Sequence, residues 1–97
     1  MASAERASSF LKALANENRL MLLCLLANGD KGVSELKEAL GMQQSAVSQQ
    51  LARLRADNLV TFKRNGKTIR YALASEEVRR TIALLYELYC APGNKPK

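Results

Sequence analysis

Residues 34–73 read SELKEALGMQQSAVSQQLARLRADNLVTFKRNGKTIRYAL, and the hydrophobic period changes inside this stretch. The first part repeats apolar residues every three or four positions, which predicts two short helices separated by a turn. Ser34 is expected to cap the first helix, and Gly41 to end it. Leu36, Ala39 and Leu40 are expected to face inward from this helix, and Met42 is the apolar residue of the turn.

The second of these helices is expected over about Gln44 to Ala56, with Val47, Leu51 and Leu54 facing the core. At about 100° per residue, the opposite face then carries small and uncharged polar side chains with one arginine. The outward residues are Ser45, Gln49, Ala52, Arg53 and Ala56, with Ser48 beside them. Gln43 and Gln44 stand at the helix start, where backbone N–H groups favour phosphate.

After this helix the pattern becomes alternating and rich in β-branched and aromatic residues. Two strands are expected, over Leu59–Arg64 and Thr68–Leu73, joined at Asn65-Gly66, which is a strong hairpin signal. In the second strand Ile69, Tyr71 and Leu73 share one face. Two short helices followed by a basic hairpin are typical of a winged helix-turn-helix.

The flanking sequence predicts three more helices. The first covers about Ala4 to Leu14, and the second runs from an N-cap at Asn16 to about Ala27 and is apolar nearly all round, as in a buried central helix. The last begins after a cap at Ser75 and ends near Cys90. The fold class is therefore mainly α with a β-hairpin, in the order α-α-α-α-β-β-α. We expect one domain over residues 1–90 and a flexible tail over 91–97.

Composition narrows the function. The 97 residues, 47% hydrophobic, allow one small domain, so oligomerisation is a plausible source of extra stability. A net charge of +6 favours a polyanionic partner. The absence of histidine excludes His-based metal sites and Ser-His-Asp or Cys-His catalysis, so we expect neither an enzyme nor a cofactor. No apolar run is long enough to cross a bilayer and the N-terminus does not resemble a signal peptide, so a cytoplasmic protein is expected.

Together these features predict binding to double-stranded DNA. Gln can pair with adenine, Arg with guanine, and Ala can contact a thymine methyl in the major groove. The basic residues of the hairpin are expected to contact phosphate: Lys63, Arg64, Lys67 and Arg70. Taken alone, each element also fits a blander interpretation, either a solvated helix face or an edge hairpin protected by charge. A module that docks an acidic protein is the alternative class of function.

The stretch Gln44–Leu51, followed by Leu54-Arg55 and Leu59-Val60, resembles the ArsR/SmtB family of bacterial winged-helix repressors. The resemblance covers about residues 8–90. It departs from the common family form at Gln50, where His is usual, and at Gln43, where Ser is usual. The first of these residues is expected to have a packing or backbone-contact role, and the second leaves the start of the recognition helix open.

The resemblance implies a homodimer on an inverted-repeat operator, with the first and last helices pairing across the two-fold axis. The side chains fitting that role are Phe10, Leu11 and Leu14, together with Val78, Ile82, Leu85 and Tyr89. The alternative is that these stripes complete the core of one chain.

Many family members sense metals, but the third helix here has no cysteine and the last has no histidine, so no metal site is expected. From pattern alone, Cys24 and Cys90 are as well explained as small buried residues. Their sequence contexts, however, resemble the BigR/SqrR-like branch of the family, with HlyU and YgaV. That resemblance implies a sensor in which reactive sulfur species or oxidants bridge the two cysteines and lower DNA affinity.

Overall fold

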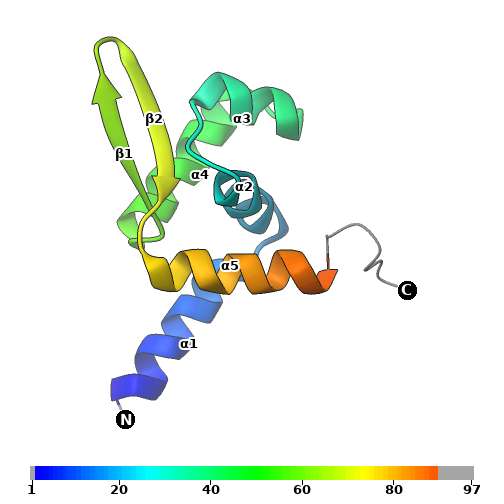
Figure 1. Ribbon diagram of the computed structural model, residues 1–97, viewed down its shortest axis with the longest axis vertical. Coiled ribbons are helices and arrows are strands. Elements are labelled where there is room, and N and C mark those ends of the chain that lie inside the picture. Colours follow the sequence, from blue (N-terminus) through cyan, green and yellow to red (C-terminus); the bar gives the residue numbers. More distant parts are fainter. Residues whose placement is uncertain (1, 90–97) are drawn as a thin grey trace.

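The structure, a computed structural model, describes residues 2–89 as five helices and one antiparallel hairpin (Figure 1). The elements are α1 (Ala2–Leu14), α2 (Glu17–Ala27), α3 (Val33–Leu40), α4 (Gln44–Ala56), β1 (Val60–Asn65), β2 (Thr68–Leu73) and α5 (Glu76–Tyr89). This order confirms the predicted winged helix-turn-helix. Cys90 and the predicted tail over 91–97 lie outside the described residues.

Three of the predicted helix boundaries are set by local contacts that the sequence indicated. The backbone N–H of Arg19 donates to Asn16 Oδ1 at 3.1 Å, so Asn16 caps α2. The N–H of Val78 donates to Ser75 Oγ at 3.2 Å at the start of α5. Gly41 ends α3 in the left-handed region, with φ of 64°, which a residue without Cβ adopts easily.

The start of α3 differs from the prediction. Ser34 lies inside the helix, and the N-cap is Gly32, whose N–H donates to Glu35 Oε1 at 3.0 Å. The Glu35 carboxylate therefore accepts from the backbone of the N-cap residue, whereas a Ser34 cap would have accepted from an N–H further along the helix. Ala39 is also exposed rather than inward-facing, whereas Leu36 is fully buried as expected.

The hairpin turns one residue later than Asn65-Gly66. Asn65 pairs with Thr68, so the two-residue loop is Gly66-Lys67, with Gly66 at φ of 67°. The base of the hairpin gains a third pairing partner, because Lys31 and Tyr71 exchange backbone hydrogen bonds of 2.9 and 2.8 Å. The loop between α2 and α3 thus extends the sheet by one bridge.

The core lies among α2, α4, α5 and the base of the hairpin. Val47, Leu51 and Leu54 of α4 are fully buried, as their spacing predicted. Of the remaining buried side chains, α2 contributes Leu22, Leu23 and Leu26, α5 contributes Val78 and Ile82, and other segments contribute Leu14, Leu36, Leu59, Val60 and Leu73. One face of α4 is therefore fixed to the core and the other is left to solvent.

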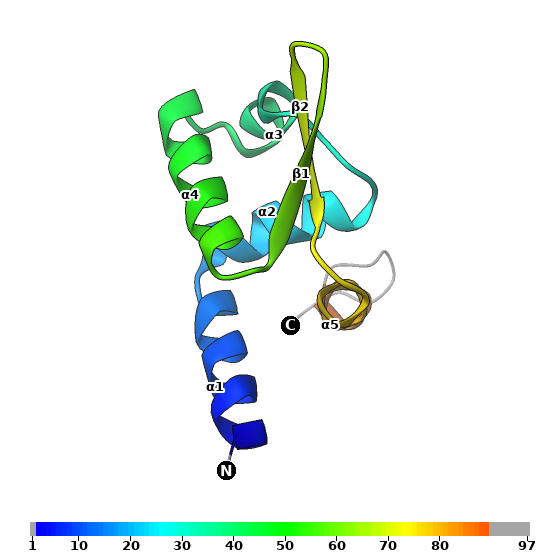
Figure 2. The ribbon, with the colours of Figure 1, turned by 90° about the vertical axis from the view of Figure 1, so that its left-hand side faces the viewer.

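The hairpin and α1 project at opposite ends of the molecule (Figures 1 and 2). In both views α3 and the start of α4 lie toward the hairpin end, while α1 extends from the other end. None of the helices between residues 2 and 89 has the length and apolar character needed to span a bilayer. The start of α4 and the basic hairpin therefore lie toward the same end of the molecule.

Candidate nucleic-acid interface

The exposed side of α4 carries every residue of that helix that the sequence suggested for base or phosphate contact. All of them are solvent-exposed, including the two at the helix start: Gln43, Gln44, Ser45, Ser48, Gln49 and Arg53. The helix can present them because its other side is locked in the core by three fully buried aliphatic residues. A polar face of this kind, with Arg53 as its one charged residue, suits hydrogen bonding to base edges in the major groove.

Gln50 lies between this face and the core and is half-buried. With Asn16, Arg19, Gln49 and Arg53 it lines a small polar hollow between α2 and α4. Arg19 Nη1 donates to the backbone oxygen of Ala13 at 3.0 Å, which satisfies an acceptor at the end of α1. The half-buried Gln50 therefore lies where α4 adjoins the start of α2.

At the tip of the hairpin, Lys63, Arg64 and Lys67 are exposed. Within residues 2–89, none of the three forms an ion pair or hydrogen bond with another side chain. Their charges are therefore available to an external anion. This arrangement suits non-specific contact with a phosphate backbone, which positions a protein on a duplex.

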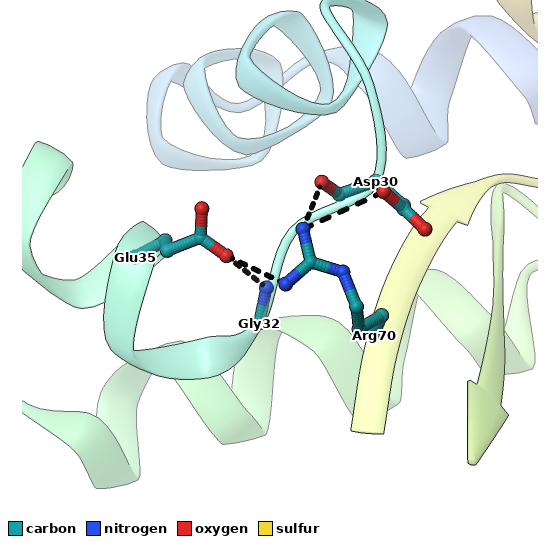
Figure 3. Close-up of polar contacts among 4 residues, drawn as sticks. All are labelled: Asp30, Gly32, Glu35 and Arg70. Carbon is teal, nitrogen blue, oxygen red and sulfur yellow. Dashed lines mark hydrogen bonds and ion pairs between the residues drawn. The ribbon is translucent and has the colours of Figure 1, made fainter. Parts of the chain in front are cut away.

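Arg70 is different, because its guanidinium is used inside the chain (Figure 3). Nη1 donates to Glu35 Oε1 at 3.0 Å, and Nη2 donates to the backbone oxygen of Asp30 at 2.8 Å. Nη2 also lies 3.5 Å from Asp30 Oδ1, and the Arg70 side chain is only 37% exposed. The two terminal nitrogens of Arg70 thus meet acceptors of α3 and the preceding loop, contacts that the sequence analysis did not predict.

Glu35 is the common acceptor of this cluster. The hydrogen bond from the Gly32 N–H is the main cause that lowers the pKa of the Glu35 carboxyl. Desolvation opposes it, and the charge and hydrogen bond of Arg70 lower the pKa further. These contacts therefore favour the ionised carboxylate, which is the form that accepts from Arg70 and from the Gly32 N–H.

A second arginine holds the other strand of the hairpin. The Arg55 guanidinium carbon lies 4.1 Å from the centre of the Phe62 ring, a cation–π contact between the end of α4 and β1. Phe62 in turn meets Tyr71 of β2 edge-on, with ring centres 5.8 Å apart. The hairpin is thus tied to the helices through both strands.

The sequence analysis did not find these roles of Asp30, Glu35 and Arg55. The partners of Arg70 lie 35 and 40 residues away along the chain, and periodicity carries no information about such pairs. The only sequence signal was an excess of basic residues, four on the hairpin and two on α4, more than a phosphate-binding tip alone requires.

The predicted dimer residues fall into two groups. Leu14, Val78 and Ile82 are at most 4% exposed in the single chain, so they have almost no surface left to bury against a partner, and the structure assigns them to the core. Phe10 and Leu85 are half-buried. Leu11 and Tyr89 are 61% and 59% exposed, and they retain surface for an interface.

The sequence analysis missed the most exposed apolar strip of α5, formed by Leu84 and Leu88, which are 54% and 49% exposed. This strip lies roughly 100° around the helix from the buried Val78–Ile82 line. An open groove also runs between α1 and α5, with Phe10 and Ala13 on one side and Val78 and Thr81 on the other. Charged side chains also line this groove, among them Arg53 of α4, so the exposed apolar surface of α5 is best described by Leu84 and Leu88.

Cys24 lies on α2 and is half-buried against the core. Helix α2 packs against α5, and Cys90 is the next residue in the chain after the end of α5 at Tyr89. The position of the second thiol lies outside the described residues.

Comparison with known proteins agrees with this geometry. Residues 16–61 match the family model described as "Bacterial regulatory protein, arsR family". The chain is 47% identical to the transcriptional activator HlyU of Vibrio cholerae, over 88% of this chain and 79% of that protein. It is 45% identical to the biofilm growth-associated repressor of Agrobacterium fabrum, over 84% of this chain and 70% of that protein.

Solved structures show the same relationship. Reduced HlyU from Vibrio cholerae superposes with a TM-score of 0.88 at 44% identity, covering 93% of this chain and 95% of the other. The homodimeric winged helix-turn-helix DNA-binding domain of Mb0332 from Mycobacterium bovis gives 0.79 at 36% identity, covering 90% and 81%. These relatives are named as transcriptional regulators or DNA-binding domains and not as enzymes. The chain belongs to the ArsR family of bacterial regulatory proteins.

Proposed function

We propose that this protein is a sequence-specific transcriptional repressor of the bacterial cytoplasm that binds an inverted-repeat operator as a homodimer. We further propose that bridging Cys24 and Cys90 lowers its operator affinity. The observation that carries the DNA-binding part is the exposed polar face of α4, together with three basic side chains at the hairpin tip that form no ion pair within residues 2–89. The helix would read bases in the major groove while the tip contacts phosphates.

The dimer is supported by exposed apolar surface on α1 and α5. Leu11, Leu84 and Leu88 are each about half exposed or more, and exposed apolar surface can mark an interaction site. Mb0332, a relative of similar fold, is described as homodimeric. A two-fold axis near α1 and α5 would place two α4 helices on successive half-sites.

The thiol switch is supported by the packing of α2, which carries Cys24, against α5, which ends one residue before Cys90. One relative, HlyU, was solved in a form described as reduced. In the proposed reaction with glutathione persulfide, one cysteine thiolate attacks the outer sulfur and releases glutathione thiolate. The second thiolate then attacks the resulting cysteine persulfide at its inner sulfur, forming the disulfide and releasing hydrosulfide. Two thiols lose two electrons, and the transferred sulfur gains them.

The test uses a duplex enriched by the reduced protein from a random-sequence library. Fluorescence anisotropy gives the affinity for this duplex before and after treatment with glutathione persulfide, and mass spectrometry of the cysteine peptides identifies the bridge. The switch is supported if treatment lowers the affinity of the wild type and has no such effect on Cys24→Ser or on Cys90→Ser. Equal affinity in the two states leaves a repressor that does not respond to redox conditions.

A docking module for an acidic protein predicts a different outcome. Gln49→Ala should relax the sequence preference if α4 reads bases, whereas a docking module has no sequence preference for this substitution to change. If the protein enriches no preferred sequence from the library, the repressor proposal fails at its first step.

A further inference from the structure

We infer that Arg70 is a positioning residue for the hairpin, fixing the DNA-contacting tip relative to α3 and α4 rather than contacting DNA itself. This inference rests on the proposed DNA binding. It adds a distinction among the four basic hairpin residues, which the sequence presents as equivalent: three supply charge to the outside and one fixes the geometry of the others.

The first argument is the geometry of the Arg70 contacts. Its two terminal nitrogens meet three acceptors on two different segments: Glu35 on α3, and the backbone and side chain of Asp30 in the preceding loop. A planar guanidinium can hold acceptors in two directions at once, whereas a lysine ammonium on a flexible stem cannot fix the same fork. The contact therefore sets the orientation of β2 relative to α3 and not only its distance.

A second, independent contact lies next to the first. Tyr71 exchanges two backbone hydrogen bonds with Lys31, directly after Asp30 in the loop. Residues 70 and 71 thus hold residues 30 and 31 through a side-chain fork and a main-chain bridge. Without the Lys31 bridge the sheet has only two strands, and a two-stranded ribbon is marginally stable by itself.

The arrangement also explains why Arg70 makes a poor phosphate ligand. A phosphate would have to compete with a carboxylate at 3.0 Å and a backbone oxygen at 2.8 Å, and Glu35 and Asp30 would repel it. Lys63, directly opposite Arg70 in the hairpin register, is exposed and meets no such acceptor among the described residues. Cross-strand neighbours therefore have separate tasks.

The inference makes an unusual prediction for an acidic residue. Removing a negative charge from a DNA-binding protein normally strengthens binding, because repulsion of the phosphates falls. Glu35→Ala removes one side of the Arg70 fork, so it should instead weaken binding. Glu38→Ala is the matched control: it lies on the same helix, is exposed, and has no hydrogen bond or ion pair with a described residue.

The experiment measures the affinity of full-length variants for the enriched duplex by fluorescence anisotropy. Arg70→Ala and the charge-conserving Arg70→Lys should both bind about tenfold more weakly, and Glu35→Ala about three- to tenfold more weakly. Glu38→Ala should bind as well as the wild type or better. Arg70→Ala combined with Glu35→Ala should be clearly less than additive, whereas its combination with Glu38→Ala should be additive.

A DNA-independent measurement accompanies the affinities. Amide hydrogen exchange of β1 and β2 should quicken by about five- to thirtyfold in Arg70→Lys, while exchange in α2 and α4 stays unchanged. Wild-type affinity in Arg70→Lys together with wild-type hairpin exchange would overturn the inference and leave the proposed function intact. Equal effects of Glu35→Ala and Glu38→Ala would overturn it as well. If the wild-type protein enriches no sequence, the proposed function itself fails.

Discussion

Arg70 and Lys67 lie three residues apart in one hairpin and carry the same charge, yet their surroundings differ completely. The Lys67 ammonium has no partner among the described side chains, whereas the Arg70 guanidinium has carboxylate and backbone acceptors within 3.0 Å. At the scale of single residues, the net charge therefore predicts a polyanionic partner but does not identify which basic side chains contact it.

The ionisation of Glu35 provides a prediction at this scale. Its folded-state pKa is lowered from 4.5, so its contribution to stability is fully present above pH 4.5 and is lost as the pH falls through the folded-state value. NMR titration of the side-chain carboxyl should give a midpoint below 4.5. In Arg70→Ala the midpoint should rise, although it should stay depressed because the Gly32 N–H still donates. An unchanged midpoint in that variant would show that the ion pair does not form in solution.

The sequence could not identify the Arg70 cluster for a physical reason. Caps and turns depend on residues within three or four positions of each other, as Asn16, Gly41 and Ser75 illustrate, and these were predicted correctly. The Arg70 contacts depend on how the hairpin folds back over α3, which is a property of the whole fold. The local assignment of Ser34 as the cap of α3 was wrong, because the helix begins after Gly32, whose N–H donates to Glu35.

At the scale of elements, α4 was the most predictable part of the chain. Its bounds at Gln44 and Ala56 match the prediction, because a turn precedes it and its buried stripe follows the helical period without interruption. The last helix was predicted less well. Its stripe from Val78 to Ile82 was correctly identified as apolar, but periodicity does not distinguish burial in one's own core from burial against a partner.

The buried stripe of α4 is expected to control the stability of the domain. Leu51 is fully buried, so Leu51→Ala should lower the free energy of unfolding by about 2–5 kcal/mol, through lost apolar transfer and a residual cavity. Chemical denaturation at one fixed protein concentration measures the change. Gln49→Ala, two residues away on the exposed face, should change it by less than about 0.5 kcal/mol. Comparable losses in both variants would contradict the assigned helix orientation.

The hairpin tip should show its role in the salt dependence of DNA binding. Lys67→Ala should weaken binding to all sequences alike and reduce the slope of log affinity against log salt by about 1. Lys12→Ala removes the same charge from the last turn of α1, outside the predicted DNA-contacting residues, and should leave the slope unchanged. Equal slopes for Lys67→Ala and the wild type would remove the tip from the interface. Salt titrations by anisotropy distinguish these results.

At the scale of the whole molecule, polar and apolar surfaces are separated. The hairpin tip and the start of α4 lie toward one end, whereas the exposed apolar side chains of Leu84 and Leu88 lie on α5. A protein that reads two half-sites needs this separation, because the surface that pairs the subunits must leave both reading helices uncovered.

A charge placed on the apolar strip tests this division. Leu88→Glu should convert a dimer to monomers, because an unpaired carboxylate buried in an interface costs several kcal/mol. Sedimentation velocity should show the smaller species, and affinity for a two-half-site duplex should fall toward that for a single half-site. Ala83→Glu adds the same charge to another exposed position, on a different face of α5, and should leave the dimer intact. A loss of DNA affinity without a change in mass would mean that α5 acts on α4 within one subunit. An unchanged mass and affinity would place the subunit contact elsewhere on the chain.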